Sequence, residues 1–98
     1  MIKLYKYKGY SKYSLFLYNS EYALIRWYPK GSTTIHFHKG KTCTMNILKG
    51  PLKEYRYSHN KKINTLTSNN QYYIDDTIGC HQMVNPGPIT KWSYHVYR

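Results

Sequence analysis

The stretch from Tyr22 to Leu48 decides the fold, and it reads YALIRWYPKGSTTIHFHKGKTCTMNIL. It contains three short runs of alternating side chains, separated by turn signals at residues 29–32 and 39–41. Side chains alternate between the two faces along a strand, so one pairing register assigns every residue to a face. The stretch therefore predicts three antiparallel strands that follow one another in a meander.

The predicted register divides this stretch into an apolar and a polar face. Pairing Ile25 with Ile35, and Ile35 with Met45, makes both hairpins agree on the same division. The apolar face would contain Ala23, Ile25, Trp27, Ile35, Phe37, Cys43, Met45 and Ile47. The opposite face would contain Tyr22, Leu24, Arg26, Thr34, His36, His38, Thr42 and Thr44. We therefore expect one dry face and one face available to a polar partner.

The flanking segments extend the sheet. Residues 13–18 are apolar on both faces, which is typical of a central strand, and pairing Leu15 with Ile25 adds them to the meander. Residues 2–8 carry lysines that suit the edge of a sheet. Further strands are expected at 52–57 and at 91–97, the latter with Trp92, Tyr94 and Val96 inward, and a weak hairpin at 63–68 and 71–75, before an irregular segment at 77–90.

These elements indicate one domain over residues 1–98. We predict a mainly β fold, in which an antiparallel meander sheet curls into a small barrel or sandwich. No segment shows a convincing helical period, although an α+β arrangement with one short helix on the sheet is the alternative.

The charge of the chain restricts its partners. Its 98 residues include 15 Lys and Arg against 4 Asp and Glu, for a net charge of +11. Such a charge favours an anionic partner, namely nucleic acid, an acidic protein or a membrane surface. Most of the cations are lysines, whose point charge suits phosphate attraction better than the reading of base edges.

Lysines and tyrosines are interleaved in the first two thirds of the chain. A cationic surface with aromatic stacking platforms is how proteins bind single-stranded nucleic acid. The candidate nucleic-acid-binding residues are Lys6, Lys8, Tyr22, Arg26, His36, His38, Lys39, Lys41, Tyr55 and Arg56.

The sequence His36-Phe37-His38 places two imidazoles on one face of a strand. A metal site would need a further donor from His59, His81 or His95, at no recognised spacing, and we predict neither metal nor cofactor. A metal-independent ribonuclease would use His36, His38 and His95 as acid and base, with Lys41 or Arg26 stabilising the charge on phosphorus. An exposed polar face that uses histidine as a neutral donor or acceptor is the third interpretation.

The leading hypothesis is a small basic nucleic-acid-binding protein of a virus or mobile element. Single-stranded RNA or DNA is the favoured partner, and binding is favoured over catalysis. The alternatives are a host-directed or regulatory protein that docks on an acidic protein surface, and a ribonuclease of the toxin type. No apolar run reaches transmembrane length, so we expect no membrane partner and a place in the host cytoplasm, with Cys43 and Cys80 as free thiols. The edge strand at residues 2–8 would also allow a homodimer.

Overall fold

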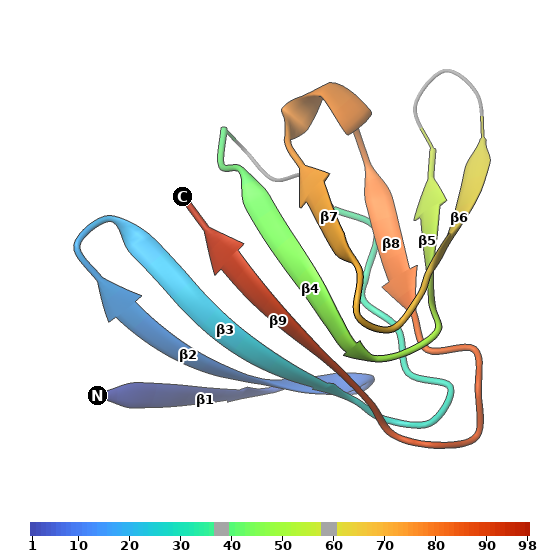
Figure 1. Cartoon of the computed structure of the whole chain (residues 1–98), viewed down its shortest axis with the longest axis horizontal. Helices are drawn as coiled ribbons and strands as arrows, with labels where there is room; N and C mark the ends of the chain where they lie inside the picture. Colours follow the sequence, from blue (N-terminus) through green and yellow to red (C-terminus); the bar gives the residue numbers. More distant parts are fainter. Residues whose placement is uncertain (37–39, 58–60) are drawn as a thin grey trace.

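The computed structural model describes residues 1–36, 40–57 and 61–98. In these residues the chain forms antiparallel strands and a single 3₁₀ turn (Figure 1). The elements are β1 (Ile2–Lys6), β2 (Tyr10–Leu17), β3 (Ser20–Trp27), β4 (Cys43–Lys49), β5 (Leu52–Arg56), β6 (Lys62–Leu66), β7 (Gln71–Ile74), η1 (Asp76–Ile78), β8 (His81–Val84) and β9 (Lys91–Tyr97). No helix in the described ranges is long and apolar enough to cross a membrane.

The strands form two sheets that close on a shared core. The large sheet has the order β1-β2-β3-β9-β4-β7 and the small sheet has the order β6-β5-β8 (Figure 1). Buried residues of both sheets make one hydrophobic cluster: Ile25, Trp27, Cys43, Met45, Ile47 and Ile74 from the large sheet, and Leu52, Leu66 and Met83 from the small one. The predicted mainly β barrel or sandwich is confirmed.

The predicted meander is wrong in its central pairing. Strand β9 lies between β3 and β4 and pairs with both, so residues 33–36 are not the neighbours of either strand. The described part of that segment instead makes isolated bridges to β8, Ser32 with Val84 and His36 with His81. The long alternating run of β9 offers a ladder on both edges, whereas the short polar segment before His36 offers few apolar contacts.

The register of the first hairpin differs from the predicted one by three residues. Lys12, rather than Leu15, is opposite Ile25. An odd shift exchanges the two faces of a strand. Lys12 and Ser14 therefore face the interior, while Leu15 lies on the outer face. The tighter turn, in which Tyr18 has a φ of 54°, produces the difference.

The last strand, β9, buries the face that was predicted to point outward. Ser93 and His95 are buried, and Lys91 is 4% exposed, whereas Trp92 and Tyr94 are only partly buried. The interior of the large sheet is therefore more polar than apolar patterning predicts, and the buried groups are hydrogen-bonded as such groups require.

The remaining segments combine confirmed strands with a wrong pairing. Strand β1 lies at the edge of the large sheet, as predicted. Strands β6 and β7 exist where a hairpin was expected, but β6 pairs with β5 and β7 pairs with β4. The segment expected to be irregular contains β8, which positions His81. The expectation for Phe37 and His38 lies outside the described residues.

Asn85 gives the first testable prediction. This fully buried amide donates to the carbonyls of Trp27, Tyr28 and Ile89, at 3.3, 3.0 and 2.8 Å, and accepts from the Gly87 N–H. Replacing it leaves several buried carbonyls without their hydrogen-bond donor, so Asn85→Ala should lower the free energy of unfolding by about 2–3 kcal/mol. Urea unfolding measures this loss. The exposed Gln71→Ala is the control and should change stability by less than about 0.5 kcal/mol; equal effects would contradict the assignment.

Candidate functional site

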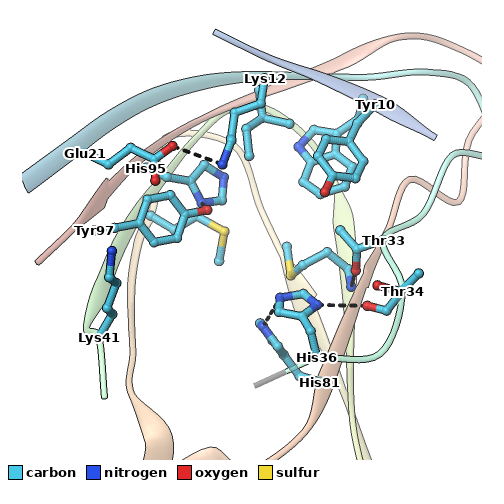
Figure 2. Close-up of a pocket in the computed structure, with 14 residues that line it drawn as sticks. Tyr10, Lys12, Glu21, Thr33, Thr34, His36, Lys41, His81, His95 and Tyr97 are labelled. Atoms are coloured by element: carbon cyan, nitrogen blue, oxygen red, sulfur yellow. Dashed lines mark hydrogen bonds and ion pairs between the residues drawn. The ribbon is translucent and has the colours of Figure 1, made fainter. Parts of the chain in front are cut away.

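A cavity of about 280 Å³ opens between the two sheets (Figure 2). Its walls come from β2, β3, β4, β8 and β9, from the segment before residue 37 and from Lys41. Its polar lining includes Tyr10, Lys12, Glu21, Thr33, Thr34, His36, Lys41, His81, His95 and Tyr97. A cavity of this size suits a small molecule.

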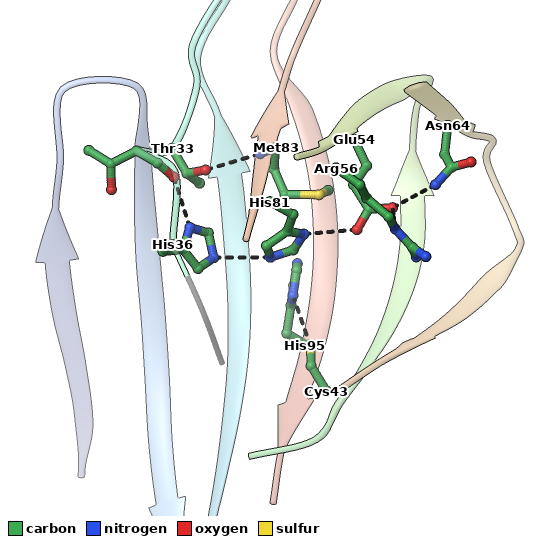
Figure 3. A network of polar contacts seen from close by, with 10 residues as sticks. Thr33, His36, Cys43, Glu54, Arg56, Asn64, His81, Met83 and His95 are labelled. Atoms are coloured by element: carbon green, nitrogen blue, oxygen red, sulfur yellow. Dashed lines mark hydrogen bonds and ion pairs between the residues drawn. The ribbon is translucent and has the colours of Figure 1, made fainter. Parts of the chain in front are cut away.

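Two histidines meet at one wall of the cavity. The backbone N–H and carbonyl of His36 pair with those of His81, at 2.9 and 3.0 Å. Thr33 adds to this attachment, because its Oγ1 accepts from the Met83 N–H at 3.0 Å. The bridge brings the two Nε2 atoms to 3.1 Å from each other (Figure 3).

The other nitrogen of each ring is held by an acceptor. Nδ1 of His36 lies 2.8 Å from the Thr34 carbonyl, and Nδ1 of His81 lies 2.8 Å from Oε2 of Glu54. A carbonyl and an ionised carboxylate only accept, so each Nδ1 carries the hydrogen. When both rings are neutral, each directs the lone pair of its Nε2 atom toward the other.

Facing lone pairs at this distance repel unless a cation lies close to both of them. Protonation of His36 is disfavoured, because desolvation by burial and the charge of a protonated His81 lower its pKa. Neutral imidazoles bind transition metals, and metal-bound histidines use their second nitrogen to donate to a carboxylate or a carbonyl. The arrangement of His36, His81 and Glu54 therefore fits a divalent transition metal.

The described residues supply two imidazoles to this centre. Within residues 1–36, 40–57 and 61–98, no cluster of three His, Cys, Asp or Glu side chains is placed to hold a metal. His38, which was predicted to share the face of His36, lies outside these ranges.

Glu54 is buried and remains ionised. Burial alone would raise its pKa, but the hydrogen bonds from His81 and Asn64 and the charge of Arg56 lower it to about 2. Oε1 accepts from both Arg56 and Asn64 at 3.0 Å, and Oε2 accepts from His81 (Figure 3). Glu54 therefore holds the orientation and the protonation pattern of His81.

A second polar chain crosses the opposite wall. The indole N–H of Trp27 donates to Oγ of Ser93 at 2.8 Å, and that hydroxyl lies 2.7 Å from Nε2 of His95. The indole can only donate, so the Ser93 hydrogen is left for His95. Nδ1 of His95 then faces Oη of Tyr97 at 3.3 Å and Sγ of Cys43 at 3.6 Å.

Cys43 and Tyr97 stay protonated at neutral pH. Desolvation by burial raises the pKa of Cys43 to about 12, and it raises the pKa of Tyr97 well above its usual value. The carboxylate of Glu21 acts on both groups in the same direction. Tyr97 is therefore a neutral phenol that lies beside His95 at the wall of the cavity (Figure 2).

The structure separates most of the predicted binding residues. His36 and Lys41 line the cavity together with His95. Lys6 and Lys8 are exposed at the β1 end, Tyr22 and Arg26 lie on the outer face of β3, and Tyr55 and Arg56 belong to β5. His38 and Lys39 lie outside the described residues. The predicted set therefore does not form one continuous surface.

The geometry agrees with the comparison against protein families. The profile of the cysteine dioxygenase type I family matches residues 9–98, which is nearly the whole chain. The chain belongs to the cysteine dioxygenase type I family.

Solved structures support the fold assignment of this family member. AerE from Microcystis aeruginosa is similar with a TM-score of 0.83 and 18% identity, over 99% of this chain and 45% of AerE. Drosophila melanogaster CENP-C bound to CAL1 has a TM-score of 0.82 and 11% identity, over 99% and 80% of the two chains. A cupin-2 domain from Rhodospirillum rubrum has a TM-score of 0.75 and 18% identity, over 99% and 69%. The fold is therefore that of a cupin domain, and the chain spans less than half of AerE.

The family match overturns the functional hypothesis drawn from composition. The hypotheses of a viral nucleic-acid-binding protein and of a ribonuclease using His36 and His38 are wrong, because the chain belongs to the cysteine dioxygenase type I family and has a cupin fold. The partner prediction is confirmed only in a coarser form: cupin domains of this fold include one that binds a protein. No comparison supports nucleic acid as a partner.

Sequence analysis missed most of the cavity. Glu54, Lys12 and Glu21 were not assigned to a site, and His81 was only one of three alternatives for a further ligand. The signal in β9 was the alternation of Ser93, His95 and Tyr97 with bulky apolar residues. Either face of such a strand can be the interior, so the pattern alone assigns the wrong one.

Glu54 gives a prediction on acid stability. Its folded-state pKa is about 2 against 4.5, so its stabilising effect is present above pH 4.5 and disappears as the pH falls toward 2. With a chelator present, Glu54→Gln should lower the free energy of unfolding by about 3 kcal/mol at neutral pH. Urea unfolding at several pH values should show the gap to the parent narrowing between about pH 4.5 and pH 2. A gap of constant size would contradict the ion pair.

Proposed function

We propose that the chain is a metal-dependent dioxygenase of a small thiol such as cysteine. The opposed Nε2 atoms of His36 and His81, 3.1 Å apart with both Nδ1 atoms committed as donors, carry this proposal. Membership of the cysteine dioxygenase type I family supports the substrate class. A redox-active divalent ion such as Fe(II), when bound, supplies a centre that binds a thiolate and dioxygen together.

The reaction proposed here balances without a further reductant. A thiol R–SH and O₂ give the sulfinic acid R–SO₂H, in which both oxygen atoms are bonded to sulfur. The sulfur is oxidised and the dioxygen is reduced. The cavity of about 280 Å³ is lined by His36 and His81 and has room for a small substrate.

The protein side chains orient and polarise the reactants. His36 and His81 would hold the metal, and Glu54 keeps the lone pair of His81 directed at it. Tyr97, protonated because of its burial, presents an O–H donor toward negative charge that develops on oxygen or sulfur. His95, anchored by Ser93, holds that phenol in position.

The metal site and the reaction can be tested together. Protein loaded with Fe(II) should consume O₂ in the presence of cysteine and release the sulfinic acid, measured with an oxygen electrode and by mass spectrometry. His81→Ala should lower both bound iron and oxygen uptake at least about a hundredfold, since it removes a ligand. The control Gln71→Ala changes an exposed residue that does not line the cavity, and it should retain both the bound iron and the oxygen uptake. An iron-loaded parent that consumes no O₂ with cysteine would refute the proposal.

The outer face of the large sheet supports a second role, in assembly. Its register places Leu4, Tyr13, Leu24 and Tyr94 in one row across four strands, and a parallel row contains Ile2, Leu15, Tyr22 and Val96. Leu4 is 48% exposed and Ile2 is 66% exposed. An apolar face of this extent on a small domain marks a protein interface.

We propose a second copy of the chain as the occupant of this face. The two rows carry no charge that would select a different partner, and a flat apolar patch is self-complementary about a two-fold axis. Light scattering after size exclusion should show a dimer that Leu4→Lys and Tyr13→Lys together convert to a monomer. Ile63→Lys, at an exposed position of the small sheet, is the matched control and should leave the dimer intact. A parent that is monomeric at about 100 μM would refute this role.

A further inference from the structure

A series of three aromatic rings leads from the cavity to the protein surface. Trp27 and Tyr10 both line the cavity, and they are opposite each other in the pairing of β2 with β3 (Figure 2). The centroids of their rings are 5.1 Å apart, and the ring of Tyr7 is stacked on that of Tyr10 at 4.6 Å. Trp27 is 1% exposed, whereas Tyr7 is 44% exposed. The three rings therefore connect the interior with the solvent.

The innermost ring has a proton acceptor within reach. Removing one electron from an indole makes its N–H strongly acidic, so the oxidation is favoured where a base takes up the proton. The indole N–H of Trp27 donates to Oγ of Ser93 at 2.8 Å, and that hydroxyl lies 2.7 Å from Nε2 of His95. The indole proton can pass to Ser93 while the Ser93 hydrogen passes to His95, which leaves a neutral indolyl radical and an imidazolium.

The second ring is a phenol whose hydroxyl is desolvated. Burial, with a smaller effect of Tyr7, raises the pKa of Tyr10 to about 12. A phenylalanine ring would pack against Trp27 without a hydroxyl that has to be desolvated. Two oxidisable phenols in succession beside an indole therefore indicate a role beyond packing.

The cavity also contains side chains that an oxidant would damage. Met45 and Met83 line it and belong to the hydrophobic core. Oxidation of a core methionine to the sulfoxide makes an apolar side chain polar and disrupts the packing around it. A centre that reacts with O₂ needs a way to exclude such side reactions when no thiol is bound.

We propose that Trp27, Tyr10 and Tyr7 form an electron path that carries oxidising equivalents from the cavity to the protein surface when no thiol is bound. An electron passes from Trp27 to an oxidant in the cavity, from Tyr10 to Trp27, and from Tyr7 to Tyr10. This inference rests on one part of the proposed function, namely a redox-active metal at His36 and His81.

Electrons and protons balance over the path. Trp27 and Tyr10 each regain an electron and a proton, so the net loss is one electron and one proton from Tyr7. The phenoxyl radical left at Tyr7 then takes a hydrogen atom from a thiol in solution. Two such events reduce one hydrogen peroxide to two waters and join two thiols in a disulfide: H₂O₂ + 2 R–SH → 2 H₂O + R–S–S–R.

Hydrogen peroxide in the absence of thiol should leave the radical at Tyr7. Iron-loaded protein is treated with peroxide and a water-soluble nitroso spin trap, and peptide mass spectrometry locates the adducts and any methionine sulfoxide. The adduct at Tyr7 should exceed that at Tyr18 at least about tenfold, although Tyr18 is fully exposed in the turn between β2 and β3. A radical that diffuses in solution would favour Tyr18, and metal-free protein should form neither adduct.

Tyr10→Phe interrupts the path and keeps an aromatic ring in place. It should lower the Tyr7 adduct at least about tenfold, since about 1.4 kcal/mol of added barrier is enough for that, and it should raise the sulfoxide content of Met45 and Met83. Tyr7→Phe should raise the same sulfoxide content, whereas the matched control Tyr18→Phe should change neither the Tyr7 adduct nor the sulfoxide. Thermal unfolding confirms that each variant is folded.

The outcomes distinguish this inference from the proposed function, which oxygen uptake with cysteine measures separately. Adducts that favour Tyr18, or a Tyr7 adduct that stays within about twofold in Tyr10→Phe, overturn the path even if the parent oxidises cysteine. Adducts at Tyr7 that depend on Tyr10, without oxygen uptake on cysteine, support the path and remove the dioxygenase proposal. A parent that binds no iron overturns both.

Discussion

Glu54 is a buried carboxylate, and the need to keep it ionised organises the small sheet and the candidate metal centre together. Its donors come from three strands: Arg56 from β5, Asn64 from β6 and His81 from β8. An unpaired charge at this depth would cost several kcal/mol, so the three strands must keep their register for the charge to be satisfied. Because His81 donates through Nδ1, its Nε2 atom faces His36 at the wall of the cavity. The same contact thus stabilises the fold and prepares a ligand.

The interior of the large sheet contains polar groups at positions where apolar side chains would give a small domain more stability. Lys12, Glu21, Ser93 and His95 all face inward, and each has a polar partner within the sheet or across the cavity. Buried polar groups give little net stability even when they are satisfied. Their accumulation on one wall therefore points to a site rather than to a packing solution, and it accounts for the departure from simple apolar patterning.

Composition misled the functional hypothesis for a related reason. A net charge of +11 describes the average surface of the chain, and most of the lysines that produce it are exposed. The cavity has a different balance, since Glu21 neutralises Lys12 there. The candidate site lies in a cavity to which a few residues contribute. The net charge of the whole chain therefore says little about the charges inside this cavity.

The amino-acid sequence alone determined that the protein is a mainly β domain and where most of its strands lie, because alternation of side chains is a local pattern. It also identified Ala23, Ile25, Trp27, Cys43, Met45 and Ile47 as buried residues, which they are. Only the tertiary structure decided which strands are neighbours and in which register. Apolar side chains on both faces of residues 13–18 fit either register, and the choice places either Leu15 or Lys12 inside. The meeting of His36 with His81, 45 positions apart, depends on β8 crossing to the segment before residue 37. Contacts between distant segments depend on the packing of the whole chain, and no local period encodes them.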